Sequence, residues 1–198
     1  MAVLFGLLWP LQRVNDVLLA IGRAIAVAAL AIMVCLILAQ IFFRYAVGDA
    51  LNWTEEAARF GMLWMVGLMA PLAYRLGGFV AIDMLERALP RRLSAILTLI
   101  LLAISLVVLV FMADKGINNH VDSLSGRGAS SSLRLPLDWF GGERIRFRNA
   151  WAYASLVTGV LLTILVSIEL ILRQLIVALG SGADLKPLRP DDEIAGAS

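Results

Sequence analysis

The sequence predicts an all-α integral membrane protein with four transmembrane helices and an interfacial amphipathic helix between the second and third spans. The first observation is composition. The chain of 198 residues is 61% hydrophobic and 16% charged, with a mean hydropathy of +0.87. A soluble domain is typically about 45–50% apolar and about 25% charged. The second observation is that the apolar residues form long uninterrupted runs, as membrane spans require.

Four uncharged runs mark the predicted spans. Three of them contain 20 or 21 residues, which at about 1.5 Å per residue gives roughly 30 Å, the thickness of the hydrocarbon core. The second run, 60–74, has 15 residues and crosses the membrane only if its helix begins near Thr54. The predicted spans are therefore about 24–43, 55–74, 93–113 and 149–168.

Residues 1–23 are predicted to be an amphipathic lead-in at the membrane interface, where Trp9 and Arg13 are suited to the headgroup layer. The apolar run that follows is longer than the roughly 7–15 residues of a signal peptide, and three further spans come after it. We therefore expect this run to remain in the mature protein.

A surface helix is predicted over 79–89, because its apolar residues lie on one face and its charged residues on the other. Arg91 and Arg92 follow this segment and are placed to hold anionic lipid headgroups. The charged candidates for contact with the membrane surface are Asp83, Arg87, Arg91 and Arg92. The predicted membrane domain covers 24–179 and includes an extramembrane loop, 114–148. A polar tail, 180–198, follows it.

Two strips of small side chains are predicted to be helix-packing faces. Lipid gives helices no hydrophobic reason to associate, so small residues that allow close backbone approach take that role. The strip in the first span contains Ala24, Ala28, Ala31, Cys35 and Ala39. The strip in the fourth span contains Ser155, Gly159, Thr163 and Ser167, each four residues apart.

Two adjacent carboxylates, Glu55 and Glu56, stand in the first turn of the predicted second helix, where the helix dipole favours negative charge. Three interpretations stay open: a helix-end stabiliser paired with Arg59, a contact with a partner subunit, and a catalytic pair. Adjacent helical residues point about 100° apart, so the two acids are poorly arranged to share a proton. With neighbouring aromatic residues, the partner-interface candidates are Trp53, Glu55, Glu56, Arg59 and Trp64.

Several classes of function find little support in the composition. A single histidine, His120, and a single cysteine, Cys35, argue against a metal or haem site within one chain, and no cofactor is predicted. The scattered basic residues do not suggest nucleic-acid binding. The four runs contain no ionisable residue, which argues against transport by this chain alone. An independent four-helix transporter or channel and a membrane enzyme using Glu55 and Glu56 remain the alternatives.

The region Trp53–Pro90 resembles a known family. The sequence Trp53-Thr54-Glu55-Glu56, followed by Arg59, Trp64, Gly67, Arg75, Asp83 and Leu89-Pro90, is similar to the small membrane subunit, of the DctQ type, of tripartite ATP-independent periplasmic (TRAP) transporters. One position departs from the family pattern: Phe79 stands where the family often has a histidine. Any role assigned to that histidine is absent here.

The resemblance implies a non-catalytic subunit of an ion-coupled uptake system for organic acids. In that family the small subunit pairs with a large, multi-spanning transport subunit, which carries the substrate and sodium sites. A separate periplasmic binding protein delivers the substrate. The resemblance thus implies a scaffold that supports the large subunit in the bacterial inner membrane and helps to form the docking surface for the binding protein.

Orientation follows from the two short connections between spans. The segment Arg75–Arg92 contains four Lys or Arg residues, whereas Arg44–Arg59 contains two. Short positively charged loops tend to stay in the cytoplasm. We therefore expect both termini to be cytoplasmic.

Overall fold

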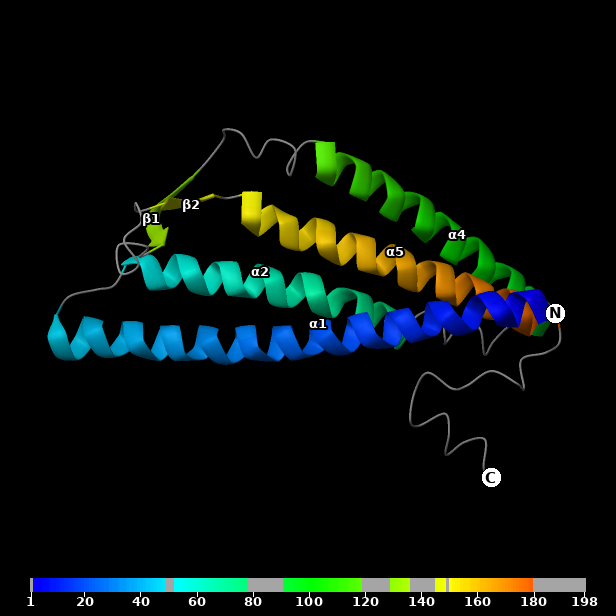
Figure 1. Ribbon diagram of the computed structural model, residues 1–198, viewed down its shortest axis with the longest axis horizontal. Helices are drawn as coiled ribbons and strands as arrows, with labels where there is room; N and C mark the ends of the chain where they lie inside the picture. The colour runs from blue at the N-terminus through cyan, green and yellow to red at the C-terminus, as the bar shows by residue number, and fades with distance from the viewer. Residues whose placement is uncertain are drawn as a thin grey trace, which may run out of the picture. The chain divides into compact units, whose positions relative to one another are not determined.

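Four long helices make up most of the described part of the computed structural model (Figure 1), which covers residues 2–48, 52–77, 91–118, 129–135, 145–148 and 150–179. They are α1 (Ala2–Phe42), α2 (Asn52–Arg75), α4 (Arg91–Gly116) and α5 (Ala150–Ala178). All four are long and apolar enough to cross a membrane. The predicted four-span membrane architecture is confirmed, whereas the predicted surface helix, 79–89, lies outside the described residues.

The first helix continues well beyond the predicted span. α1 runs unbroken from Ala2 to Phe42, so the helix has no boundary at residue 23. Its 41 residues give a length of roughly 60 Å, about twice the hydrocarbon thickness. A π-helical turn, η1 (Phe43–Val47), extends it to Gly48, whose φ of 80° is a left-handed conformation that glycine adopts at little cost.

The fourth spanning helix also extends beyond the uncharged run of its predicted span. α5 ends at Ala178, ten residues past the expected end of the span at Ile168. Glu169 and Arg173 interrupt the uncharged run in the sequence, but in the structure they pair with each other and do not end the helix.

Two short strands lie within the segment that was predicted only as an extramembrane loop. β1 (Ala129–Leu135) and β2 (Ile145–Arg148) pair in an antiparallel arrangement, with Leu135 opposite Ile145. The register is irregular between Ala129 and Arg134. The sequence did not predict this pair, because the first strand is rich in serine and lacks an alternating apolar pattern.

The chain divides into two compact units, and each is described by itself. Unit 1 contains Met1–Ala20, Ala70–Phe111 and Val160–Ser198. Its described core combines apolar residues with an unusual share of polar ones. The apolar members are Leu8, Leu19, Leu102, Val160, Val166 and Ile176, and the polar members are Asn15, Ser94, Thr163, Ser167 and Glu169.

Unit 2 contains Ile21–Met69 and Met112–Gly159. Within it, Gly22 of α1 packs on Leu68 of α2, and Ala29 of α1 packs near Gly61 of α2. Since the order of residues is reversed between the two helices, α1 and α2 are antiparallel in this unit. The described core consists mostly of small and apolar side chains. Its apolar members are Ala26, Ala58, Leu68, Ala113, Ala150 and Val157, and its polar members are Thr54 and Ser155.

Candidate functional site

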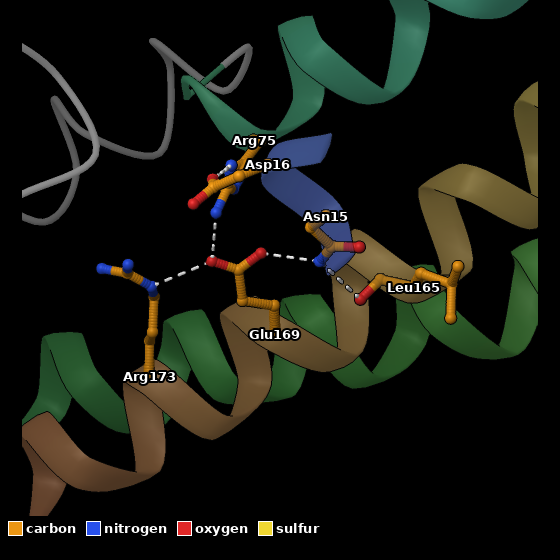
Figure 2. A network of polar contacts seen from close by, with 6 residues as sticks. All are labelled: Asn15, Asp16, Arg75, Leu165, Glu169 and Arg173. Atoms are coloured by element: carbon orange, nitrogen blue, oxygen red, sulfur yellow. Dashed lines mark hydrogen bonds and ion pairs between the residues drawn. The ribbon is translucent and has the colours of Figure 1, made fainter. Parts of the chain in front are cut away.

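A fully buried carboxylate, Glu169 of α5, lies at the centre of an ionic cluster in unit 1 (Figure 2). Glu169 Oε1 accepts hydrogen bonds from Arg75 Nη2 at 2.7 Å and from Arg173 Nε at 3.3 Å. Glu169 Oε2 accepts from Asn15 Nδ2 at 2.6 Å, and the same amide lies 3.4 Å from Leu165 O. The cluster therefore joins three helices, α1, α2 and α5.

Arg75, the last residue of α2, connects the two acids of the cluster. Its Nη1 donates to Asp16 Oδ1 at 2.5 Å, and its side chain is only 9% exposed. With Arg173, the cluster has two positive and two negative side chains, so its formal charges balance. Among the described residues, Arg75 Nε is a buried N–H group without a hydrogen-bond partner.

Gln12 adds a further polar contact from α1. With its amide turned so that the oxygen faces donors, Gln12 accepts from Arg173 Nη2 at 2.5 Å and from Arg173 Nε at 3.1 Å. Glu169 is thus held by three side chains: Asn15 belongs to α1, and both arginines are themselves held by residues of α1. A buried charge is tolerated only when it is paired and hydrogen-bonded in this way. This arrangement suits the fixing of helices and offers no open site for a substrate.

A smaller polar contact lies beside the cluster. The Tyr74 hydroxyl donates to Ser105 Oγ at 3.1 Å, and it lies 3.4 Å from Ser167 Oγ. These contacts connect α2 with α4 and α5 inside unit 1. Hydrogen bonds between membrane helices contribute about 0.6 kcal/mol on average, so this contact is a modest addition to the ionic cluster.

The backbones of α2 and α5 approach closely in unit 2. A Cβ atom at Gly67 would lie 2.5 Å from Ser155 O, and one at Gly159 would meet the carbonyl oxygen of Gly67. Only glycine fits at either position without movement of a backbone. The other two members of the predicted α5 packing face, Thr163 and Ser167, are buried in unit 1.

An apolar groove of about 570 Å³ lies between α1 and α2 in unit 2. Ile25, Ile32 and Leu36 line it from α1, and Phe60 and Trp64 line it from α2. The Trp64 indole also donates from Nε1 to the carbonyl oxygen of Trp151 at 3.2 Å, which ties α2 to α5. Of the predicted partner-interface residues, Trp64 is the one that the structure places in a groove.

The small-residue strip of α1 lies on the surface of the described chain. Ala24, Ala28, Ala31 and Cys35 are exposed. Each of them directly precedes a residue of the groove wall, so the strip lies about 100° from that wall around the helix. The strip and the groove wall are therefore neighbouring faces of α1.

The acid pair lies at the exposed start of α2. Glu55 Oε1 accepts from Arg59 Nη2 at 3.3 Å, and the two side chains are 68% and 72% exposed. Exposed pairs of this kind are worth well under about 1 kcal/mol. Glu56 is half-buried and Trp53 is exposed. The structure thus leaves the Glu55–Arg59 pair open to solvent, headgroups or another protein.

The charged candidates around the predicted surface helix are only partly described. Asp83 and Arg87 lie outside the described residues. Arg91 and Arg92 form the first turn of α4, but the positions of their side chains are not described. Their expected contact with lipid headgroups stays a prediction.

A comparison with known protein families identifies the chain. The family described as tripartite ATP-independent periplasmic transporters, DctQ component, matches residues 33–142, which is more than half of the sequence. The chain belongs to the DctQ family. No curated protein and no solved structure matches it.

This DctQ-family chain is accordingly a component of a transport system and a multi-pass membrane protein. The matched region includes the end of α1, from Met33 onward, and all of α2 and α4. It contains Arg75 but not Asp16 or Glu169. The ionic cluster therefore joins the part of the chain that matches the family to the parts on either side of it.

Sequence reasoning missed the ionic cluster. It treated Arg75 as the end of one uncharged run and did not connect it with Glu169, which directly follows another. Arg75 and Glu169 carry opposite charges and follow the second and fourth predicted spans, which run in the same direction across the membrane. Their position at matching ends of these spans was a usable signal for an ion pair. Asn15 and Asp16, in the lead-in before the first uncharged run, were the second signal.

Proposed function

We propose that this chain is the non-catalytic small membrane subunit of a TRAP transporter. In this role it scaffolds a large transport subunit and helps to dock a periplasmic substrate-binding protein during ion-coupled uptake of an organic acid. The observation that carries the proposal is the match to the DctQ family over 33–142. The chain would reside in the bacterial inner membrane.

The chemistry of the described helices supports a scaffold. A transporter that works alone needs ionisable groups or broken helices near the middle of the membrane. In the described helices, the fully buried carboxylate Glu169 is held by Arg75, Arg173 and Asn15. The polar groups of unit 1 thus hold the chain's own helices together, as a rigid support requires.

We further propose that the strip and groove wall of α1 receive a transmembrane helix of the large subunit. The groove is lined almost entirely by apolar side chains, and the neighbouring strip allows close backbone approach. Phospholipid tails have no need of small residues, whereas a helix partner does. Trp53, which precedes the groove residues Ala57 and Trp64 at helical spacing, extends this surface towards the start of α2.

We assign the start of α2 to the periplasmic face of the membrane. In unit 1, Asn15 near the beginning of α1 contacts Glu169 near the end of α5, which agrees with both termini being on one side of the membrane. With cytoplasmic termini, Glu55, Glu56 and Arg59 face the periplasm. The exposed Glu55–Arg59 pair then supplies polar side chains to the docking surface for the binding protein.

Co-purification with the cognate large subunit tests the proposed contact. Ala28→Phe adds a bulky ring to the exposed strip and is expected to reduce the recovered large subunit more than tenfold, because it separates the two backbones. Ala103→Phe, an equally large change at an exposed position of α4, should leave recovery within twofold. The measurement is the ratio of the two subunits after affinity purification from membranes.

The outcomes distinguish a wrong function from a wrong contact surface. If the wild-type chain does not retain its large subunit, the proposed function is wrong. If the wild type retains it and Ala28→Phe retains it equally well, the function stands and the assignment of the α1 surface is wrong.

A further inference from the structure

The exposed apolar side chains of helix α1 do not fix its position along the helix axis. Its outward faces carry large aliphatic side chains along most of its length, including Val27, Val34, Leu38 and Ile41. Lipid solvates such side chains equally well at any register. A helix of 41 residues could therefore slide along its neighbours unless a specific contact prevents it.

Two adjacent residues of α1 make contacts of that specific kind. Asn15 donates to Glu169 of α5, and Asp16 accepts from Arg75 of α2. Adjacent helical residues point about 100° apart, so this dipeptide reaches two different helices at one level. Figure 2 shows both side chains directed at the cluster, Asp16 towards Arg75 and Asn15 towards Glu169.

We propose that the pair Asn15–Asp16 sets the axial register of α1 against α2 and α5. This role goes beyond the scaffold function and does not depend on any partner subunit. A slide of one residue moves α1 by about 1.5 Å and turns it by about 100°, which withdraws Asp16 from Arg75. Asn15 is buried, and Asp16, although 56% exposed, contacts the buried side chain of Arg75. Buried polar groups are best attested as determinants of register in helical assemblies, where apolar contacts alone permit several alignments.

A second contact between α1 and α2 reports the register independently. A Cβ atom at Gly61 would lie 4.0 Å from the Cβ of Met33, a separation that suits a disulfide. Both α1 and α2 continue unbroken from the cluster to this contact. In a Cys35→Ala background, the pair Met33→Cys and Gly61→Cys should therefore cross-link efficiently in the native register.

The test moves the polar pair by one turn. The substitutions Asn15→Leu and Asp16→Leu remove it, and Leu19→Asn with Ala20→Asp rebuild it four residues later. If the pair sets the register, α1 slides by about 6 Å, and the cross-link to Gly61→Cys moves from Met33→Cys to Ile37→Cys. The expected change in the ratio of the two cross-linked yields is at least tenfold.

A simpler variant keeps the test decisive if the rebuilt helix does not fold. Asn15→Leu with Asp16→Leu alone should lose the preference for one register, so that Met33→Cys and Ile37→Cys both cross-link to Gly61→Cys. An exposed control, Val14→Leu with Val17→Leu, should keep the native pattern. Retention of the native cross-link at full yield in either register variant would overturn the proposal.

Discussion

Replacing Glu169 with leucine is expected to lower the free energy of unfolding by about 3–5 kcal/mol, the usual cost of removing one partner from a buried ion pair. Glu169 is fully buried between Arg75 and Arg173. Without its carboxylate, two arginines remain in a buried setting with only Asp16 as a counter-charge. The measurement is denaturant-induced unfolding of the purified chain in detergent, followed by loss of helical signal.

The chain contains a matched control for this substitution. Glu55 pairs with Arg59 at the same spacing and the same 3.3 Å distance as Glu169 with Arg173. The side chains of Glu55 and Arg59, however, are both exposed. Glu55→Leu is therefore expected to change stability by no more than about 0.5 kcal/mol. Equal effects of the two substitutions would show that burial of the cluster does not matter to the fold.

Replacing Gly67 with alanine is expected to cost about 1–3 kcal/mol, the range for an added methyl group that forces packed elements apart. The new Cβ would lie 2.5 Å from Ser155 O, which belongs to the backbone of α5 and cannot rotate away. α2 and α5 must then separate. Unfolding in detergent measures the loss, and a cysteine cross-link between the two helices measures the separation.

Gly61→Ala is the control on the same helix. Its new Cβ would meet Ala29 O at 3.8 Å and Met33 Cβ at 4.0 Å, both ordinary contact distances. The substitution is expected to leave stability unchanged or slightly raised, since alanine is the better helix former. A destabilisation by Gly61→Ala as large as that by Gly67→Ala would remove the proposed special role of the Gly67–Gly159 approach.

The sequence predicted the four membrane-spanning helices because a long uncharged run is a direct physical requirement of the hydrocarbon core. It did not predict how far the helices extend beyond the uncharged runs. Charged residues end each uncharged run in the sequence, but α5 continues through Glu169 because that residue is paired with Arg75. The same reasoning separated residues 1–23 from a helix that is continuous, because the pairing of Asp16 with α2 was not visible in the sequence.

The ionic cluster could not be derived from local pattern. Its contacts join residues far apart in the chain, with separations of 59, 94 and 154 positions. Periodicity within one helix does not show which residue of another helix lies at the same depth. The close approach at Gly159 is different, because the spacing of small residues on α5 suggested a packing face, although not its partner Gly67.

Transport by purified components tests the central claim most directly. One set of proteoliposomes contains this chain alone, and the other contains both membrane subunits with the periplasmic binding protein outside. The solute is an organic acid that the complete system takes up under an ion gradient. The proposed function predicts uptake only with the complete set and only background accumulation with this chain alone. Gradient-driven uptake by this chain alone would contradict the scaffold function.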